Sequence, residues 1–283
     1  MLPLKDNIPT LRFPVVTVVL ILINIAVFAW QLSLSGDQAS SPELRELGVS
    51  ERDQASLEYG AIPHRLTSPS KECALGVVPQ AGGLGSDVVC EGSRGYRQAE
   101  ALADEGAPFA PLDQVVWWFT IVTSMFMHGG WLHIIGNMLF LWVFGNNVED
   151  SMGRLRFIAF YLLAGATAVY AQSLLDTSSV VPTIGASGAV AGVLGAYMLL
   201  HPRARVVTLV FIIFFVTLIE IPAILLLAVW AALQFLPAVG QVGGGGEEGV
   251  AYFAHVGGFL FGVAMIKVFT AGRRKPGPAL RGA

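Results

Sequence analysis

The 283-residue chain is 54% hydrophobic and only 13% charged, and its formal net charge is −3. A soluble domain has about 25% charged residues, so this composition excludes an ordinary soluble protein and indicates one that lies in a lipid bilayer. The near-neutral charge, without a basic stripe, excludes a nucleic-acid-binding protein, so no nucleic-acid partner is expected.

Apolar stretches of roughly 17–25 residues are long enough to cross a bilayer as helices. The first candidate follows a short N-terminal segment and lacks a small-residue cleavage site, which predicts a retained span and not a signal peptide. The second is short, and two longer alternatives are a start nearer Met127 or an end at Val148. The predicted fold class is therefore an all-α membrane protein, a bundle of six transmembrane helices. The predicted spans are about 13–34, 131–144, 157–175, 184–201, 221–239 and 250–270.

The stretches between these spans differ in character. Residues 35–111 form a long polar insert, and its composition leaves open whether it is a small ordered cap or a flexible loop. Residues 206–219 are apolar, but Glu220 and Pro222 separate them from the fifth span, and proline suits the first turn of a helix. We predict a connector along the inner surface or packed on the bundle, with an extra span as the alternative. The glycine run Gly243–Gly246 predicts a loop.

Basic residues in short loops indicate the cytoplasmic side of a membrane protein. They precede the first span and follow the second, fourth and sixth, whereas the loops at 176–183 and 240–249 have none. This alternation predicts six spans with both termini in the cytoplasm, and the plasma membrane is the expected location. The predicted parts are an N-terminal tail with the first span (1–34), an extracytoplasmic insert (35–111), the helical core (112–270) and a basic cytoplasmic tail (271–283).

Three of the predicted spans carry polar side chains near their outer ends. His133 and Asn137, spaced i, i+4, share one face of the second span. Ser187 begins the fourth span and His255 lies early in the sixth. At 1.5 Å per residue, each lies within roughly 5–10 Å of the outer end of its helix. Polar groups in lipid usually face a cavity or one another, so we expect these four side chains to meet.

A serine beside a histidine is an arrangement that activates a hydroxyl group. The imidazole takes the hydroxyl proton as the oxygen attacks a carbonyl, and it returns the proton to the leaving amine. His133, Asn137 and the backbone N–H of Ser187, at a helix N-terminus, are expected to donate hydrogen bonds to the developing oxyanion.

Small residues predict close contacts between the spans that carry this pair. Gly188 and Gly192 form a small-xxx-small pattern in the fourth span. Gly257 and Gly258, with Gly262 one turn later, are expected to let the sixth span press against the fourth. This packing would bring the imidazole to the hydroxyl group.

These residues resemble the motifs of rhomboid intramembrane serine proteases. The stretch 185–188 (GASG) resembles their GxSG motif, 254–258 (AHVGG) resembles AHxxG, and 128–137 resembles HxxxxHxxxN. The similarity runs in the family's order from about Met125 to Phe269. The resemblance implies a six-helix bundle that cleaves transmembrane protein substrates within or near their membrane segments, without a cofactor or metal. It also implies Ser187 as nucleophile and His255 as base, and it places His133 and Asn137 at the oxyanion site.

The chain departs from the family at one position near the site. Some members have a tyrosine four residues after the serine, where this chain has Ala191, so the resemblance does not indicate what holds the tautomer of His255. His128 is expected to have a structural role in the outer loop. Glu149 is expected to make a hydrogen bond or ion pair at the inner face. Gly185, Gly188 and Gly258 are interpreted as structural residues near the site.

Several alternatives stay open on the sequence alone. Cys73 and Cys90 lie in the insert, where an oxidising side allows either a disulfide or two free thiols, and they are too few for a zinc site. The chain could also be a non-catalytic relative that binds transmembrane helices. A transporter or channel is a third possibility, although such sites tend to lie nearer the midplane of the membrane.

Overall fold

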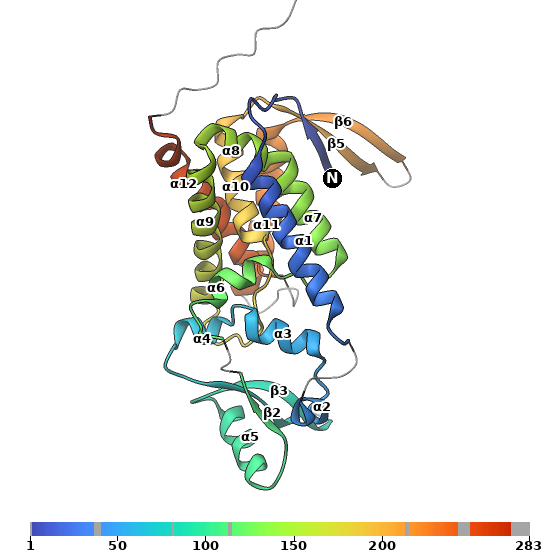
Figure 1. Cartoon of the computed structure of the whole chain (residues 1–283), viewed down its shortest axis with the longest axis vertical. Coiled ribbons are helices and arrows are strands. Elements are labelled where there is room, and N and C mark those ends of the chain that lie inside the picture. Colours follow the sequence, from blue (N-terminus) through green and yellow to red (C-terminus); the bar gives the residue numbers. More distant parts are fainter. Residues whose placement is uncertain are drawn as a thin grey trace, which may run out of the picture.

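The computed structural model describes residues 2–36, 41–80, 82–112, 115–212, 215–242 and 250–272. It is mostly helical, with a bundle of long helices between a small mixed domain at one end and a β-hairpin at the other (Figure 1). The predicted glycine loop Gly243–Gly246 and the basic residues Arg273, Arg274 and Lys275 lie outside the described residues.

In the described part of the chain, four helices are long and apolar enough to cross a membrane. They are α1 (Val15–Ser33), α9 (Arg154–Leu175), α11 (Ala223–Val242) and α12 (Tyr252–Thr270). Two further apolar helices are shorter. These are α10 (Ser187–Leu200) and α7 (Trp131–Phe140), which continues through a π-helical turn, η2 (Leu141–Gly145), into α8 (Asn146–Met152). The structure is therefore mostly helical, with helices suited to a membrane.

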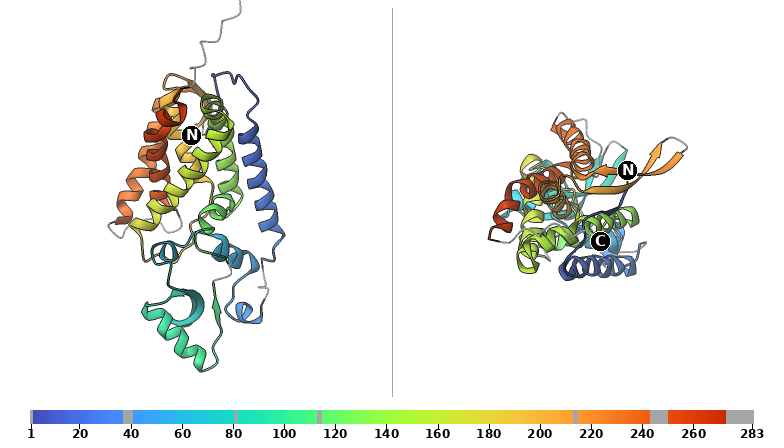
Figure 2. Two further views of the ribbon diagram at one scale, coloured as in Figure 1. Left: turned by 60° about the vertical axis from the view of Figure 1, so that its left-hand side comes forward. Right: turned by 90° about the horizontal axis from the view of Figure 1, so that it is seen from above.

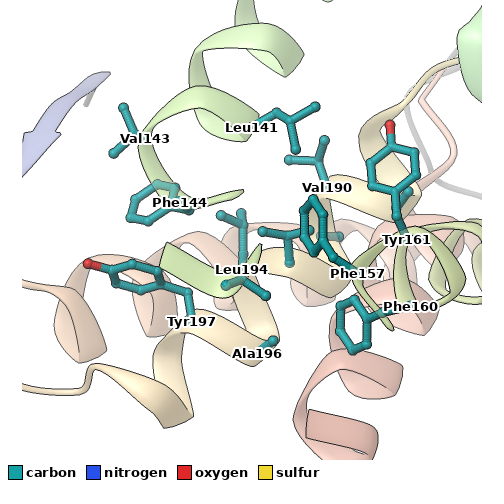
Figure 3. Packing of buried hydrophobic residues seen from close by; sticks show 14 of the residues in the cluster. Leu141, Val143, Phe144, Phe157, Phe160, Tyr161, Val190, Leu194, Ala196 and Tyr197 are labelled. Atoms are coloured by element: carbon teal, nitrogen blue, oxygen red, sulfur yellow. The ribbon is translucent and has the colours of Figure 1, made fainter. Parts of the chain in front are cut away.

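Helix α10 lies at the centre of the bundle. Every residue from Gly188 to Tyr197 is buried, which is typical of a helix that is apolar on all sides. Leu194 and Tyr197 of α10 pack among aromatic side chains of the neighbouring helices, including Phe144 and Phe157 (Figure 3). The surrounding helices thus enclose α10 from Gly188 to Tyr197.

Glycines set the distance between α10 and α12. A Cβ atom on Gly258 would overlap the carbonyl oxygen of Gly188, and one on Gly262 would overlap that of Gly192. The predicted close contact of these two helices is therefore confirmed. Gly257 faces a different neighbour, because a Cβ atom there would meet Ala171 of α9.

The N-terminus of α1 is capped by a side chain from α8. Pro14 precedes α1 and no side chain of its own N-terminus caps it. The carboxyl oxygens of Glu149 accept hydrogen bonds from the backbone N–H groups of Val16 (3.1 Å) and Thr17 (2.8 Å) and from the Thr17 hydroxyl (2.8 Å). Glu149 therefore makes the hydrogen bonds expected of it, and they join the first helix to the bundle.

Replacing Glu149 by alanine is expected to destabilise the protein by about 3 kcal/mol, because two buried N–H groups and a hydroxyl would lose their acceptor. Asp150 is the matched control. It accepts one exposed bond, from the N–H of Leu11 at 2.6 Å, and its replacement by alanine should cost about 1 kcal/mol or less. Thermal unfolding in detergent micelles measures both, and equal losses in the two variants would contradict this role of Glu149.

The polar insert is folded. It contains α2 (Pro42–Glu46), α3 (Glu51–Tyr59), α4 (Pro63–Thr67), β2 (Cys73–Gln80), β3 (Gly83–Cys90), α5 (Arg94–Asp104) and β4 (Phe109–Pro111), with a three-stranded antiparallel sheet of order β3-β2-β4. Cys73 and Cys90 face each other in the β2–β3 register and form a disulfide. Of the two alternatives for the insert, the structure shows the ordered cap. It lies at one end of the bundle in both side views (Figure 1 and Figure 2).

Two short segments join the insert to the bundle. They are α6 (Thr120–Thr123) and the 3₁₀ turn η1 (Ser124–Phe126), which precede α7. The side chains of Trp118 and Phe119, just before α6, are exposed.

The alternative of an extra span at residues 206–219 is wrong, because the described residues of this stretch are β-strands that connect α10 to α11 at one end of the bundle. Residues 206–212 and 215–219 belong to the antiparallel pair of β5 (Arg205–Ile212) and β6 (Phe215–Pro222), and β1 (Leu2–Asp6) pairs with β5 to complete a second sheet. The strands are rich in β-branched residues, which favour extended structure. The hairpin projects from the end of the bundle opposite the insert (Figure 1). The two sheets also correct the all-α prediction.

Candidate functional site

The structure brings Ser187 and His255 together. The Oγ atom of Ser187, at the first residue of α10, lies 2.8 Å from Nε2 of His255 in the first turn of α12. The close approach of the two helices at their glycines makes this distance possible. Gly185, two residues before Ser187, has a φ of 124°, a conformation that side-chain-bearing residues rarely adopt.

The other ring nitrogen of His255 also has a partner. Nδ1 lies 2.7 Å from Oε1 of Gln234 on α11. One turn earlier on the same helix, the Trp230 ring lies against the imidazole, with centroids 6.2 Å apart and planes at 40°. The imidazole is thus held between Ser187 on one side and α11 on the other.

His133 and Asn137 lie beside this pair on α7. A Cβ atom on Gly185 would lie 2.6 Å from Nε2 of His133, so this ring faces the backbone that leads to Ser187. The Asn137 amide donates to the backbone carbonyl of His133 at 2.9 Å. His128 is buried, and its backbone exchanges hydrogen bonds with the Gln31 side chain of α1, while its ring lies 5.0 Å from that of His133.

A cavity of about 1640 Å³ contains the site. Its walls include Ser187, His255, His133, Asn137, Gln234 and Trp230. Asp87 and Pro63 of the insert also line it. The cavity therefore runs from the polar cluster between the helices to the end of the bundle that the insert covers. Among the described residues, no group of three or more His, Cys, Asp or Glu could hold a metal ion.

The insert also holds the loop that precedes Ser187. Ala61 and Thr183 exchange backbone hydrogen bonds of 3.1 and 2.9 Å, and the N–H of His64 donates to the carbonyl of Ser179 at 3.0 Å. Three residues separate Thr183 of this β-bridge from Ser187. The position of the serine thus depends on the insert as well as on the helices.

Sequence reasoning missed Gln234 and Trp230. The available signal was a glutamine inside the predicted fifth span, because a polar side chain in an apolar helix usually faces a partner or a cavity. The sequence could not identify that partner, because no local pattern determines which faces of α11 and α12 meet.

The amino-acid sequence is similar to a known protein family and to several known proteins. A family model described as "Rhomboid domain" matches residues 116–272. Rhomboid protein 1, mitochondrial, of Saccharomyces cerevisiae is 31% identical over 155 residues, which cover 53% of this chain and 42% of the yeast protein. Presenilin-associated rhomboid-like protein A, mitochondrial, of Danio rerio is 31% identical over 147 residues, which cover 50% of this chain and 35% of the fish protein.

A bacterial relative carries the word protease in its name. Rhomboid protease GluP of Bacillus subtilis is 36% identical over 104 residues, which cover 37% of this chain and 20% of that protein. Each of these three matches spans less than half of the relative's own length.

Proposed function

This chain belongs to the rhomboid family, and on that premise we propose that it is an intramembrane serine endopeptidase with Ser187 as nucleophile and His255 as general base. The observation that carries the proposal is the 2.8 Å distance between Ser187 Oγ and His255 Nε2. This distance lies within the range in which a base can take a hydroxyl proton. The named protease among the relatives supports the same reaction class.

In the proposed reaction, the Ser187 hydroxyl gives its proton to Nε2 of His255 while Oγ attacks the carbonyl carbon of a substrate peptide bond. The imidazolium then gives the proton to the leaving amine, and an acyl-enzyme on Ser187 remains. A water molecule, activated by the same imidazole, hydrolyses the ester. Side chains perform each proton transfer, so the proposal requires no cofactor.

The oxyanion of the tetrahedral intermediate needs hydrogen-bond donors. The backbone N–H of Ser187 suits this role, since the first N–H groups of a helix have no partner within the helix and lie at the positive end of its dipole. We assign His133 and Asn137 to the same oxyanion site, because both line the cavity that contains Ser187. Asn137 would have to exchange its bond to the His133 carbonyl for one to the substrate.

The proposed arrangement in the membrane has six spans: α1, the continuous α7–α8 segment, α9, α10, α11 and α12. The absence of Lys and Arg in the loops at 176–183 and 240–249 supports their outer placement, as does the basic character of the opposite end. Both termini would lie in the cytoplasm and the insert outside, where its disulfide suits an oxidising side. We place the protein in the plasma membrane, although two of the relatives above carry mitochondrial names.

The proposed substrates are other membrane proteins, cleaved within or beside a transmembrane segment. The cavity at Ser187 is lined by apolar helices and by residues of the insert, so a helix end that unwinds at this level would reach the hydroxyl group. Water would reach the site from the end of the bundle that the insert covers.

The proposal is tested by reaction of the purified protein with a fluorophosphonate, which modifies activated serine hydroxyls. We expect one label, located on Ser187 by mass spectrometry of the digested protein. Replacement of His255 by alanine should abolish labelling, because the hydroxyl loses its base. A folded wild-type protein without label, or labelled at another serine, would count against the assignment.

A further inference from the structure

We propose that Gln234 is a positioning residue that sets the tautomer and orientation of His255. The proposal rests on the proposed function and goes beyond it, because it brings a third helix, α11, into the catalytic arrangement. Its basis is the 2.7 Å distance between His255 Nδ1 and Gln234 Oε1, on the side of the ring opposite Ser187.

The two hydrogen bonds of the imidazole determine where its proton lies. The amide oxygen of Gln234 accepts hydrogen bonds but cannot donate them, so Nδ1 must carry the proton. In the neutral ring Nε2 then has a free lone pair, and it accepts a hydrogen bond from the Ser187 hydroxyl at 2.8 Å. This tautomer is the one in which Nε2 acts as a base toward Ser187.

A neutral amide suits this position better than a carboxylate. An ionised carboxylate within a membrane-spanning bundle is costly, because its charge leaves water. The glutamine amide supplies the acceptor that a histidine base needs without that charge. It also stabilises the imidazolium that forms during the reaction, because Nδ1 keeps the same hydrogen bond in the charged ring.

Trp230 completes the arrangement on α11. It lies four residues before Gln234, so both side chains project from one face of the helix toward His255. The ring of Trp230 also packs on Phe259 of α12, with centroids 6.0 Å apart. The face of α11 thus restricts the rotation of the imidazole.

The first measurement is the tautomer itself, which can be read without any substrate. Nitrogen-15 spectra of histidine-labelled protein in micelles distinguish a protonated from an unprotonated ring nitrogen, and the chain has only five histidines. The signals of His255 are assigned from their loss in His255→Ala. We expect the Nδ1–H form in the wild type and a mixture of both tautomers in Gln234→Leu. The Nδ1–H form persisting in full in Gln234→Leu would overturn the proposal.

The second measurement is cleavage of a single-span reporter protein. Gln234→Leu is expected to lower kcat about 10- to 100-fold with little change in KM, because the proposed role of Gln234 is to orient the imidazole and not to bind the substrate. This loss is smaller than the roughly 10⁴-fold found when a catalytic histidine loses a carboxylate partner, since the amide is neutral. Gln234→Glu keeps an acceptor oxygen at the same reach and should recover kcat to within about 10-fold of the wild type.

Leu233→Ala is the matched control, because Leu233 is the neighbouring residue on α11 and its side chain is exposed. It should keep kcat within about threefold of the wild type. Equal losses in Gln234→Leu and Gln234→Glu, or a change confined to KM, would overturn the positioning role. A wild type that fails to cleave and to react with fluorophosphonate would overturn the proposed function, while the nitrogen-15 spectra would still decide whether Gln234 sets the tautomer.

Discussion

Replacement of Ser187 by alanine is expected to lower kcat for cleavage of a single-span reporter protein by about 10⁶-fold, the scale on which serine peptidases respond to loss of their nucleophile. The reason is that the acyl-enzyme cannot form without Oγ. The fold should survive, because the lost hydroxyl makes one hydrogen bond, to His255, and lines a cavity. The measurement compares product formation by the two proteins in proteoliposomes that contain the reporter.

Ser173→Ala supplies the matched control for this experiment. Ser173 is a buried serine of a membrane helix, and its hydroxyl donates to the carbonyl of Val169 at 2.8 Å, within α9. Its replacement removes the same atom from a residue whose hydroxyl bonds within α9, and it should leave cleavage within about threefold of the wild type. Undiminished cleavage by Ser187→Ala would reject the proposed nucleophile.

Replacement of Gly262 by leucine is expected to destabilise the protein by about 3 kcal/mol and to lower cleavage about 100-fold. A side chain at this position would overlap the carbonyl oxygen of Gly192, which is backbone and cannot move alone. Helices α10 and α12 would have to separate. Ser187 and His255 lie on these two helices, and a displacement of 1 Å at a catalytic pair can cost about 10²-fold in rate.

Gly240→Leu is the control for this second experiment. Gly240 lies on α11, and a Cβ atom there would meet no atom within 4 Å. The substitution adds the same bulk to a membrane helix without a collision, so stability and cleavage should stay near wild-type values. Stability is read from thermal unfolding in micelles. Equal behaviour of the two variants would show that the glycine contact does not set the distance between α10 and α12.

Much of the helical framework could be predicted from the sequence, since long apolar stretches have few other stable forms in a bilayer. The limits of α9, α11 and α12 lie within a few residues of their predictions. The hairpin of β5 and β6 could not be predicted in this way. An apolar run that is rich in β-branched residues fits a span, a surface helix or a strand equally well, and only the pairing with β1 decides among them.

Part of the candidate site could likewise be predicted from the sequence, and part could not. The types and spacing of Ser187, His255, His133 and Asn137 pointed to one cluster, and the structure brings all four to one cavity. Two contacts could not be predicted: the hydrogen bond between His255 Nδ1 and Gln234 Oε1, and the backbone hydrogen bonds between Ala61 of the insert and Thr183. Each joins segments of the chain that no local sequence pattern relates.

The sequence by itself determined the long apolar helices of the bundle, the residues proposed for the chemistry and the family that the chain resembles, because these depend on apolar length and on motifs within short stretches. The tertiary structure alone decided which face of α11 meets the imidazole, which N–H groups of α1 donate to Glu149 and which elements line the cavity. Contacts between distant segments depend on how helices rotate and pack against each other, and that is settled by the fit of all side chains together.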